Sequence, residues 1–403
     1  MRPTRSPRSS LPSPLEGRRF WIAGIGGAGM SAYALLARAW GAEVRGWDRF
    51  DTPYLQHLDG IEVDVSDEPP APPEGWESYV STAFAGRIPG KSRAELLTEL
   101  VSLRDSIVVG GAHGKTTTSG MIAFCLERLG LDPAWLIGAD IPQLGGNAGT
   151  GEGWLVVEGD ESDRTIAALR PRIAVVTNVD LDHHTTFGSR TEVEELFEQW
   201  LANVSEVVRG EDLPPYDGPL TVAGLHNRRN AATALAALEL AGVPRKQAEA
   251  ELADFRGASR RLERRGEAGN VEVYDDYAHH PAEIAATLEA LSDGGRLLIL
   301  FQPHLYSRTR HLARELAEVL ATADVVAVTE VYAAREEPVE GVTGKLVVDA
   351  LAERRPGMEV AWTPSVDEGA AYLASRARPG DRLLTVGAGD VDLAAATLLD
   401  ALA

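Results

Sequence analysis

Residues 106–119 combine residue types that bind phosphate. Their sequence is SIVVGGAHGKTTTS, and the β-branched run near its start predicts a buried strand. The strand ends at Gly110 and Gly111, and after Lys115 the apolar residues recur with helical spacing. Such a loop presents backbone N–H groups and the positive end of a helix dipole to an anion. Lys115 would add a positive charge, and the Thr116 hydroxyl could ligate Mg²⁺.

This stretch matches the general phosphate-loop pattern only in part. The first glycine of G-x-x-x-x-G-K-[ST] would fall on Val109, whereas the Gly-Lys-Thr triplet at 114–116 matches. A triplet of this kind can also be a helix cap in an ordinary loop. The strand before it and the apolar helix after it favour phosphate binding.

A second glycine-rich turn follows a short apolar strand near the start of the chain. Gly24, Gly26 and Gly29 have the G-x-G-x-x-G spacing, and a helix of small residues follows them. The next strand, residues 42–47, ends at Asp48, which lies 19 positions after Gly29. This order is the Rossmann dinucleotide pattern, and it predicts a diphosphate-containing ligand on the helix N-terminus. Asp48 either contacts a ribose or simply ends its strand.

Potential metal ligands follow two further predicted strands. Residues 154–157 form an apolar strand that ends at Glu158, and residues 173–178 form a strand followed by Asp182 and His183. The carboxyl ends of parallel strands lie at the ligand-binding edge of an open α/β sheet, where carboxylates suit Mg²⁺. A solvated acidic loop is the alternative for the first strand end. Two such strand ends together favour an Mg²⁺ site.

Other polar motifs lie on a helix and on loops. Asn227 and Asn230 are three residues apart on the first turn of a predicted helix, so they share a face and could read the edge of a base. Helix capping is the alternative. Before this helix, residues 207–220 are polar and rich in Pro and Gly, which predicts a loop. After it, the C-terminal third alternates strands with helices, as in a βαβ sheet. Its predicted strands are residues 271–274, 296–301, 325–328 and 382–386.

Composition limits the class of protein. The chain has 403 residues and a net charge of −21, which argues against nucleic acid as the main partner. Its one cysteine, Cys125, excludes an internal disulfide and is expected in a helix core. No apolar run approaches the roughly 20 residues that cross a bilayer. Residues 1–17 are expected to form a disordered tail, since the first 16 have no hydrophobic core. We therefore expect a cytoplasmic protein without membrane partners.

Taken in order, the motifs resemble those of the Mur ligase family of peptidoglycan biosynthesis, from about residue 18 onward. Any one of the strings is weak evidence, whereas seven in the same order are specific. They are GIGGAGMS at 24–31, GAHGKTTT at 111–118, EGDESD at 158–163, TNVDLDH at 177–183, HNRRN at 226–230, DDYAHHP at 275–281 and FQPH at 301–304.

The resemblance implies an α/β chain of three domains. Residues 18–105 would form a Rossmann-like domain for a UDP-sugar, and residues 106–265 a central ATP-binding domain with a parallel sheet. Residues 266–403 would form a second Rossmann-like domain for an amino acid. The implied activity is ATP- and Mg²⁺-dependent ligation of L-alanine to UDP-N-acetylmuramate through an acyl phosphate, by a monomer or homodimer.

The resemblance also implies roles for individual residues. ATP would contact Gly111, Ala112, His113, Gly114, Lys115, Thr116, Thr117, Asn227, Asn230 and Arg260, with Arg261 the alternative to Arg260. The UDP-sugar would contact Gly24, Gly26, Gly27, Gly29, Met30, Ser31 and Asp48. Tyr277, His279 and Arg308 would line the amino-acid pocket. Thr116, Glu158 and His183 would hold Mg²⁺, and the catalytic residues would be Lys115, His183 and Arg308.

Several features separate this chain from other family members. No lysine occurs between Lys115 and Lys246, so the carbamylated lysine of sister ligases is absent, as in the alanine-adding branch. Ala112 and Leu305 replace a usual threonine and a usual basic residue. His183 and His226 are only 43 residues apart, which predicts that the central domain has lost a segment.

Three alternatives therefore stay open. They are a related muramyl-peptide ligase, a nucleotide-binding protein of this fold that has lost catalysis, and an NAD-dependent oxidoreductase.

Overall fold

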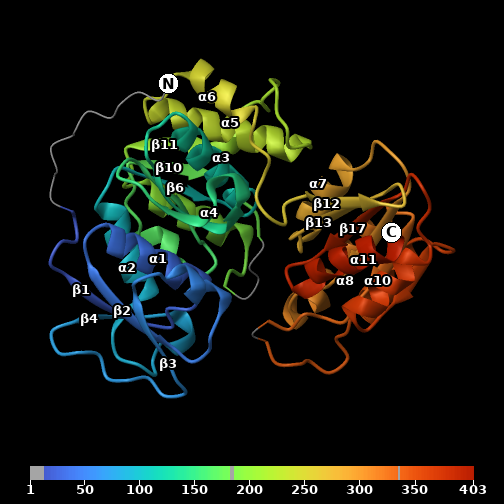
Figure 1. Cartoon of the computed structure of the whole chain (residues 1–403). Coiled ribbons are helices and arrows are strands. Elements are labelled where there is room, and N and C mark those ends of the chain that lie inside the picture. Colours follow the sequence, from blue (N-terminus) through green and yellow to red (C-terminus); the bar gives the residue numbers. More distant parts are fainter. Residues whose placement is uncertain (1–12, 182–185, 335) are drawn as a thin grey trace.

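The computed structural model describes residues 13–181, 186–334 and 336–403 of the chain. It contains three α/β domains, each built around one sheet (Figure 1). The predicted fold class, α/β with three domains, is confirmed. Boundaries near residues 105 and 265 stay a prediction.

The N-terminal sheet is parallel throughout, with strand order β3-β2-β1-β4-β5. Its elements are β1 (Arg19–Ala23), α1 (Ala28–Ala39), β2 (Glu43–Asp48), β3 (Glu62–Val65), β4 (Glu77–Val80), β5 (Lys91–Ser92) and α2 (Arg93–Ser102). A capping box formed by Ser92 and Glu95 makes α2 begin at Arg93.

The central sheet has the order β11-β10-β6-β9-β7-β8, and only the β7–β8 pair is antiparallel. Its strands are β6 (Ser106–Gly110), β7 (Ala134–Ile141), β8 (Gly146–Thr150), β9 (Leu155–Glu158), β10 (Ile173–Val176) and β11 (Glu206–Arg209). Its helices are α3 (Lys115–Arg128), α4 (Arg190–Leu201), α5 (Leu225–Leu240) and α6 (Arg245–Leu252). Every residue of β6 is buried because helices cover both faces of this sheet.

Two features of the central sheet differ from the expectation. The prediction of a loop over residues 207–220 is wrong at its start, because β11 pairs with β10 through residue 209. The β7–β8 hairpin carries no apolar alternation strong enough to predict it. The edge strands β8 and β11 are only partly buried and so show a weak pattern, whereas β7 lies inside the sheet and its first four residues are buried.

The C-terminal sheet has the order β12-β13-β17-β14-β15-β16, and only β12–β13 is antiparallel. Its strands are β12 (Glu263–Ala268), β13 (Val271–Asp276), β14 (Leu297–Phe301), β15 (Val325–Val328), β16 (Glu359–Trp362) and β17 (Arg382–Val386). Its helices are α7 (Pro281–Ala290), α8 (Tyr306–Leu320), α9 (Lys345–Arg354), α10 (Val366–Ala374) and α11 (Ala394–Leu402). Of the helices described in the three domains, none is long and apolar enough to cross a membrane.

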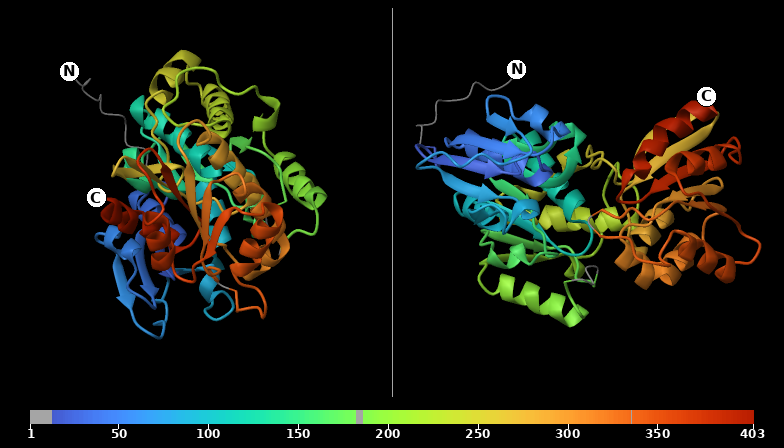
Figure 2. Two further views of the ribbon diagram at one scale, coloured as in Figure 1. Left: turned by 90° about the vertical axis from the view of Figure 1, so that its right-hand side faces the viewer. Right: turned by 90° about the horizontal axis from the view of Figure 1, so that it is seen from below.

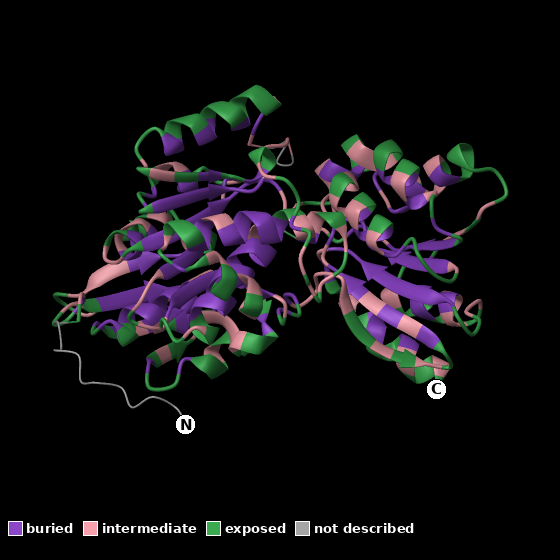
Figure 3. Cartoon of the chain, turned by 90° about the horizontal axis from the view of Figure 1, so that it is seen from above, coloured by how far each residue is buried: buried purple, intermediate pink, exposed green. Residues whose placement is uncertain are grey.

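The N-terminal and central domains share one hydrophobic core. Trp40 and Leu100 of the first belong to the same buried cluster as Val108, Leu155 and Trp200 of the second. The clusters of the C-terminal domain are built from its own elements. That domain accordingly forms a separate body in Figure 2 (right) and Figure 3. This arrangement suits movement of the C-terminal domain against a single N-terminal and central unit.

Candidate functional site

Two cavities lie where loops of the three domains meet. One, of about 580 Å³, lies between the central and C-terminal domains and is called here the central–C-terminal cavity. Its lining includes His113, Gly114, Thr117, Asn227, Asn230, Arg261, Asp276 and Glu283. The other, of about 370 Å³, has walls from all three domains and is called the three-domain cavity. Its lining includes Gly29, Arg93, Lys115, Thr116, Glu158, Arg261, Tyr277 and His279.

The phosphate loop lies between these two cavities and depends on its glycines. Gly111 and Gly114 have φ values of +129° and +81°, which side chains rarely adopt. A Cβ on Gly111 would lie 2.1 Å from Thr177 Oγ1, and one on Gly114 would lie 2.3 Å from Asn230 Oδ1. The loop leads directly into α3, whose first N–H groups have no partner within the helix.

Two residues after β10 hold the loop in place. The Asn178 backbone carbonyl accepts from Ala112 N at 3.2 Å, and its side-chain oxygen accepts from His113 N at 2.9 Å. The Thr177 hydroxyl donates to the His113 carbonyl at 2.6 Å. Sequence reasoning assigned no role to this pair, although both residues lie in a string already singled out.

Lys115 is held by a buried carboxylate. Its Nζ donates to both oxygens of Glu161, at 2.9 and 3.0 Å, and to the Gly111 carbonyl at 2.7 Å. Glu161 is 2% exposed. Burial by itself lowers the pKa of Lys115, but the charges of Glu161 and Glu158 more than offset this and raise it. The ammonium is therefore charged and lies in the three-domain cavity.

Two of the three predicted Mg²⁺ ligands are adjacent. The Thr116 hydroxyl donates to Glu158 Oε1 at 2.9 Å, and Gly138 N donates to Glu158 Oε2 at 2.6 Å. His183, the third predicted ligand, lies outside the described residues. Within residues 13–181, 186–334 and 336–403, no three acidic, histidine or cysteine side chains cluster as a metal site.

Asn227 and Asn230 lie in the central–C-terminal cavity, on the first turns of α5. Both are buried, and Asn230 Nδ2 donates to Asn227 Oδ1 at 3.4 Å. Gly224 occupies the N-cap position, and no side chain caps the helix there. The helix-capping alternative therefore does not explain this pair. Asn230 instead lies against Gly114 of the phosphate loop.

The two neighbouring arginines occupy different places. Arg260 donates to Asp275 at 3.0 Å and to the carbonyls of Gly389 and Gly387 at 2.9 and 2.7 Å. Its guanidinium is bound to the C-terminal sheet and lines neither cavity. Arg261 lines both cavities, and its Nη2 lies 3.5 Å from Thr116 Oγ1. The guanidinium carbons of both arginines lie near the Tyr277 ring, at 5.3 Å for Arg260 and 5.1 Å for Arg261. Contact of Arg260 with ATP stays a prediction, whereas the cavity lining favours Arg261 in that role.

Aromatic and histidine side chains gather on the C-terminal wall. Tyr277 and His279 line the three-domain cavity with their ring centroids 5.6 Å apart. His304 lies 5.5 Å from His279, and its Nδ1 is 3.0 Å from Arg308 Nη1. Arg308 is buried and, as described, lines neither cavity. Arg308 is linked to the three-domain cavity through His304 and then His279, which lines it.

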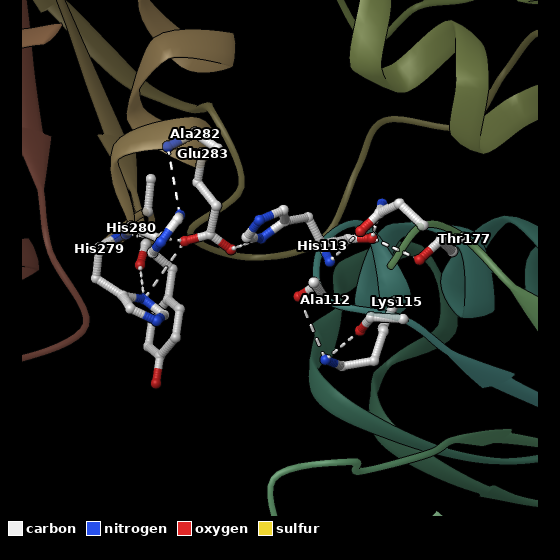
Figure 4. Close-up of polar contacts among 12 residues, drawn as sticks. Ala112, His113, Lys115, Thr177, His279, His280, Ala282 and Glu283 are labelled. Carbon is white, nitrogen blue, oxygen red and sulfur yellow. Dashed lines mark hydrogen bonds and ion pairs between the residues drawn. The ribbon is translucent and has the colours of Figure 1, made fainter. Parts of the chain in front are cut away.

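Glu283 joins the C-terminal domain to the phosphate loop. Its carboxylate accepts from His279 N at 3.1 Å and lies 3.3 Å from His113 Nδ1, as Figure 4 shows. The rings of His113 and His280 also stack across this boundary, with centroids 5.4 Å apart. Burial alone would raise the pKa of Glu283, but His279, His113 and Arg261 hold it well below its usual range. Sequence reasoning missed this contact, which joins residues 170 positions apart.

Asp276 is a second buried acid at this boundary. It accepts from Leu262 N, Ala278 N and Thr287 Oγ1, at 2.8, 2.7 and 3.0 Å. Burial raises its pKa to about 6, despite the neighbouring Arg261. Its hydrogen bonds fix the direction in which the chain leaves β13.

The residues of the N-terminal turn that were predicted to contact the UDP-sugar lie in different environments. Asp48 Oδ2 accepts from Gly26 N at 2.7 Å and is buried, so its carboxylate orders the turn that precedes α1. Met30 and Ser31 are buried within α1, at 2% and 4% exposure. Gly29 reaches the three-domain cavity. The remaining glycines, Gly24 and Gly27, give the turn its shape, since a Cβ on Gly24 would lie 2.1 Å from Ser81 Oγ.

Comparisons with known proteins agree with this arrangement. The Mur ligase middle domain matches residues 109–212, and the Mur ligase glutamate ligase domain matches residues 260–389. A UDP-N-acetylmuramate–L-alanine ligase of Kineococcus radiotolerans is 39% identical over 96% of both chains. The chain belongs to the Mur ligase family. A second such ligase, from Pelotomaculum thermopropionicum, is 35% identical over 93% of this chain and 95% of its own length.

A solved Mur ligase has a fold similar to that of this chain. The UDP-N-acetylmuramate–alanine ligase of Thermotoga maritima has a TM-score of 0.75 and 26% identity, covering 95% of this chain and 98% of its own. The alignments with the two relatives above run over 458 and 442 positions, more than the 403 residues of this Mur ligase. The relatives therefore carry residues without a counterpart here. That the missing segment belongs to the central domain stays a prediction.

Proposed function

We propose that this protein is an ATP-dependent ligase that joins L-alanine to UDP-N-acetylmuramate. One observation carries the proposal: the phosphate loop, with Lys115 and the Thr116–Glu158 pair, opens into a cavity with walls from all three domains. A reaction between three substrates needs such a meeting point. Both relatives described above bear the name of this activity.

We assign ATP to the central–C-terminal cavity and the phosphate loop. The first turn of α3 and Lys115 would hold the phosphates, with Ala112, His113, Gly114 and Thr117 shaping the cradle. Asn227 and Asn230 would face the adenine, because both line this cavity and Asn230 lies beside Gly114 of the phosphate loop. Arg261 would approach the phosphates, since it lies beside Thr116.

Thr116 and Glu158 fit one hydrated Mg²⁺. A hydroxyl and a carboxylate oxygen 2.9 Å apart, next to a phosphate loop, are oxygen ligands of the type that Mg²⁺ prefers. We assign His183 to the metal as well. When bound, Mg²⁺ would neutralise negative charge on the phosphate oxygens.

The first step forms an acyl phosphate. The lactyl carboxylate of UDP-N-acetylmuramate attacks the γ-phosphorus of ATP, the bond to the β-phosphate oxygen breaks, and ADP leaves. Negative charge on the equatorial oxygens must be stabilised during this transfer. Lys115 would supply a fixed ammonium, and Arg261 would supply a guanidinium, which lies 3.5 Å from Thr116 Oγ1.

The second step forms the amide. The uncharged amine of L-alanine attacks the acyl carbon, and a tetrahedral oxyanion forms. Phosphate leaves as the carbonyl is restored, and the nitrogen gives up one proton, which the leaving phosphate can accept. Tyr277 and His279 would contact the amino acid, supported by His304, which lies against His279, and by Arg308, which lies against His304. Movement of the C-terminal domain, which has its own core, would bring this wall to the acyl phosphate.

The test is phosphate release from ATP and Mg²⁺ with UDP-N-acetylmuramate and L-alanine supplied together or singly. Release that requires both, with the L-alanyl product seen by mass spectrometry, is the expected result. Release without them, or none, would favour a nucleotide-binding protein that has lost catalysis. A parallel assay for hydride transfer with NADH and NADPH tests the oxidoreductase, which would leave the phosphate loop unexplained.

Arg260 and Arg261 provide a matched pair of variants. We expect Arg261→Ala to lower turnover by about 10²-fold with little change in melting temperature, because its guanidinium lines the cavities. We expect Arg260→Ala to lower the free energy of unfolding by about 3 kcal/mol, because it removes the guanidinium that lies 3.0 Å from the buried Asp275 carboxylate. Steady-state kinetics and thermal melts on both variants measure this. The reverse pattern would restore Arg260 as the ATP-facing residue.

A further inference from the structure

Arg228 is a charged residue of the central domain to which the reaction described above assigns no role. It follows Asn227 in α5 but lines neither cavity. Its guanidinium is bound to the loop that precedes this helix, where Nη1 donates to the carbonyls of Tyr216 and Gly218 at 2.8 and 3.2 Å. The backbone carbonyl of Arg228 accepts from Tyr216 N at 3.0 Å. Arg228 therefore holds the loop through both its side chain and its main chain.

This loop, residues 213–218, forms part of the central–C-terminal cavity and is called here the wall loop. Its residues Leu213 and Pro215 line the cavity together with Asn227 and Asn230. Leu213 and Pro215 carry no group that binds phosphate, and apolar side chains of this kind suit the flat face of a nucleobase. The two amides suit the polar edge of a base. The wall loop and the amide pair thus present complementary surfaces.

The wall loop depends on Arg228 for its position. It begins after a short 3-10 helix, η5 (Gly210–Asp212), where Leu213 N donates to the Gly210 carbonyl at 3.2 Å. In the middle of the loop, the buried side chain of Tyr216 packs into the hydrophobic cluster of α3 and α5. Within the described part of the chain, the hydrogen bonds of residues 214–218 all involve Arg228. Loss of this arginine would therefore free the segment that contains Pro215.

We propose that Arg228 is a positioning residue for ATP, which holds Leu213 and Pro215 where they pack against the nucleotide base. The proposal rests on the proposed function, which assigns ATP to this cavity. A mobile wall loop would have to be ordered each time a nucleotide binds, and the lost conformational entropy would weaken the affinity. Because Arg228 lines neither cavity, it acts on ATP only through the loop.

The test measures nucleotide binding without ligation. Isothermal titration calorimetry compares the Mg²⁺ complexes of ADP and ATP on the wild type and on Arg228→Met. We expect both nucleotides to bind about 10-fold more weakly, and by equal factors, because the loop contacts the base that they share.

Steady-state ligation gives a second readout that a merely structural role would not move. The KM for ATP should rise by about the same factor in Arg228→Met. The kcat and the KM values for UDP-N-acetylmuramate and L-alanine should stay within about twofold of the wild type, because only nucleotide binding is weakened. Thermal melts establish that the variant is folded.

A double-mutant cycle establishes whether Arg228 acts through the wall loop. The pair of substitutions Leu213→Ala and Pro215→Ala removes the apolar wall itself and should also weaken ADP and ATP equally. In a chain that carries this pair, Arg228→Met should cause much less further weakening, because the side chains that it positions are gone.

Two single variants complete the set. Arg228→Lys should recover part of the affinity, since it keeps the charge but has fewer donors. Arg209→Met should change nothing, because Arg209 is an exposed arginine of the same domain that lines neither cavity.

Three results would overturn the inference. Unchanged affinity for both nucleotides in folded Arg228→Met would remove Arg228 from nucleotide binding. Weakening confined to ATP would place its effect on the phosphates, and full additivity in the cycle would show that it does not act through the loop. Should Arg228→Met not fold, the smaller weakening expected of Arg228→Lys carries the same test. If the wild type itself bound neither nucleotide, the proposed function would fail before Arg228 is tested.

Discussion

Replacing Lys115 with methionine should lower turnover by at least about 10³-fold. The γ-phosphoryl group gains charge at its equatorial oxygens during transfer, and Lys115 is the ammonium fixed at the phosphate loop. Steady-state phosphate release, with UDP-N-acetylmuramate and L-alanine both present, measures the loss. Turnover within tenfold of the wild type would remove Lys115 from the catalytic site.

The same variant should also be less stable, for a separate reason. Glu161 is 2% exposed, and removing one member of a buried ion pair costs about 3–5 kcal/mol. The double variant Lys115→Met, Glu161→Gln removes the buried negative charge as well. We expect it to regain most of the melting temperature and none of the turnover. Recovered activity in the double variant would show that instability alone caused the loss.

Glu158→Gln is expected to lower turnover by about 10²- to 10³-fold and to raise the Mg²⁺ concentration needed for half-maximal activity. Glutamine keeps the size of the side chain and can still accept a hydrogen bond from Gly138 N. It loses the negative charge that makes a carboxylate a strong Mg²⁺ ligand. The variant therefore tests metal binding while the hydrogen bond from Gly138 of β7 is retained.

A Mg²⁺ titration at fixed ATP, with activity as the readout, measures this effect. Glu152→Gln is the matched control, since Glu152 is exposed in the loop just before β9 and lies outside both cavities. Its Mg²⁺ requirement should equal that of the wild type. An unchanged requirement in Glu158→Gln would move the metal away from Glu158.

Much of the fold could be predicted because its strands are fully buried. β6, β10, β14, β15 and β17 consist of consecutive buried residues, and such runs are visible as apolar segments. The edge strands β3, β8, β11, β12 and β16 were not predicted, since each has exposed residues and no clear alternation. Edge strands form because a buried neighbour offers hydrogen bonds, which is a tertiary effect.

The candidate site likewise has one part that could be predicted from the sequence and one part that could not. Residues that belong to a local motif could be assigned from that motif. Lys115 and Thr116 follow from the glycine spacing of the phosphate loop, and Glu158 follows from its position at a strand end. The partners that hold them could not, because Glu161, Asn178 and Glu283 act across 46, 65 and 170 positions of the chain. The pairing of Lys115 with buried Glu161 likewise adds a contribution to stability that the phosphate-loop pattern does not predict.

The sequence by itself determined which chemical groups the candidate site contains and the order of the strands and loops that carry them. A β-branched run followed by glycines and Lys115 specifies a strand, a loop and a helix through local backbone preferences alone. Only the tertiary structure decided which of two adjacent arginines lines the cavities, and which distant carboxylates hold the phosphate loop. Those outcomes depend on packing between segments far apart in the chain, which no local pattern encodes.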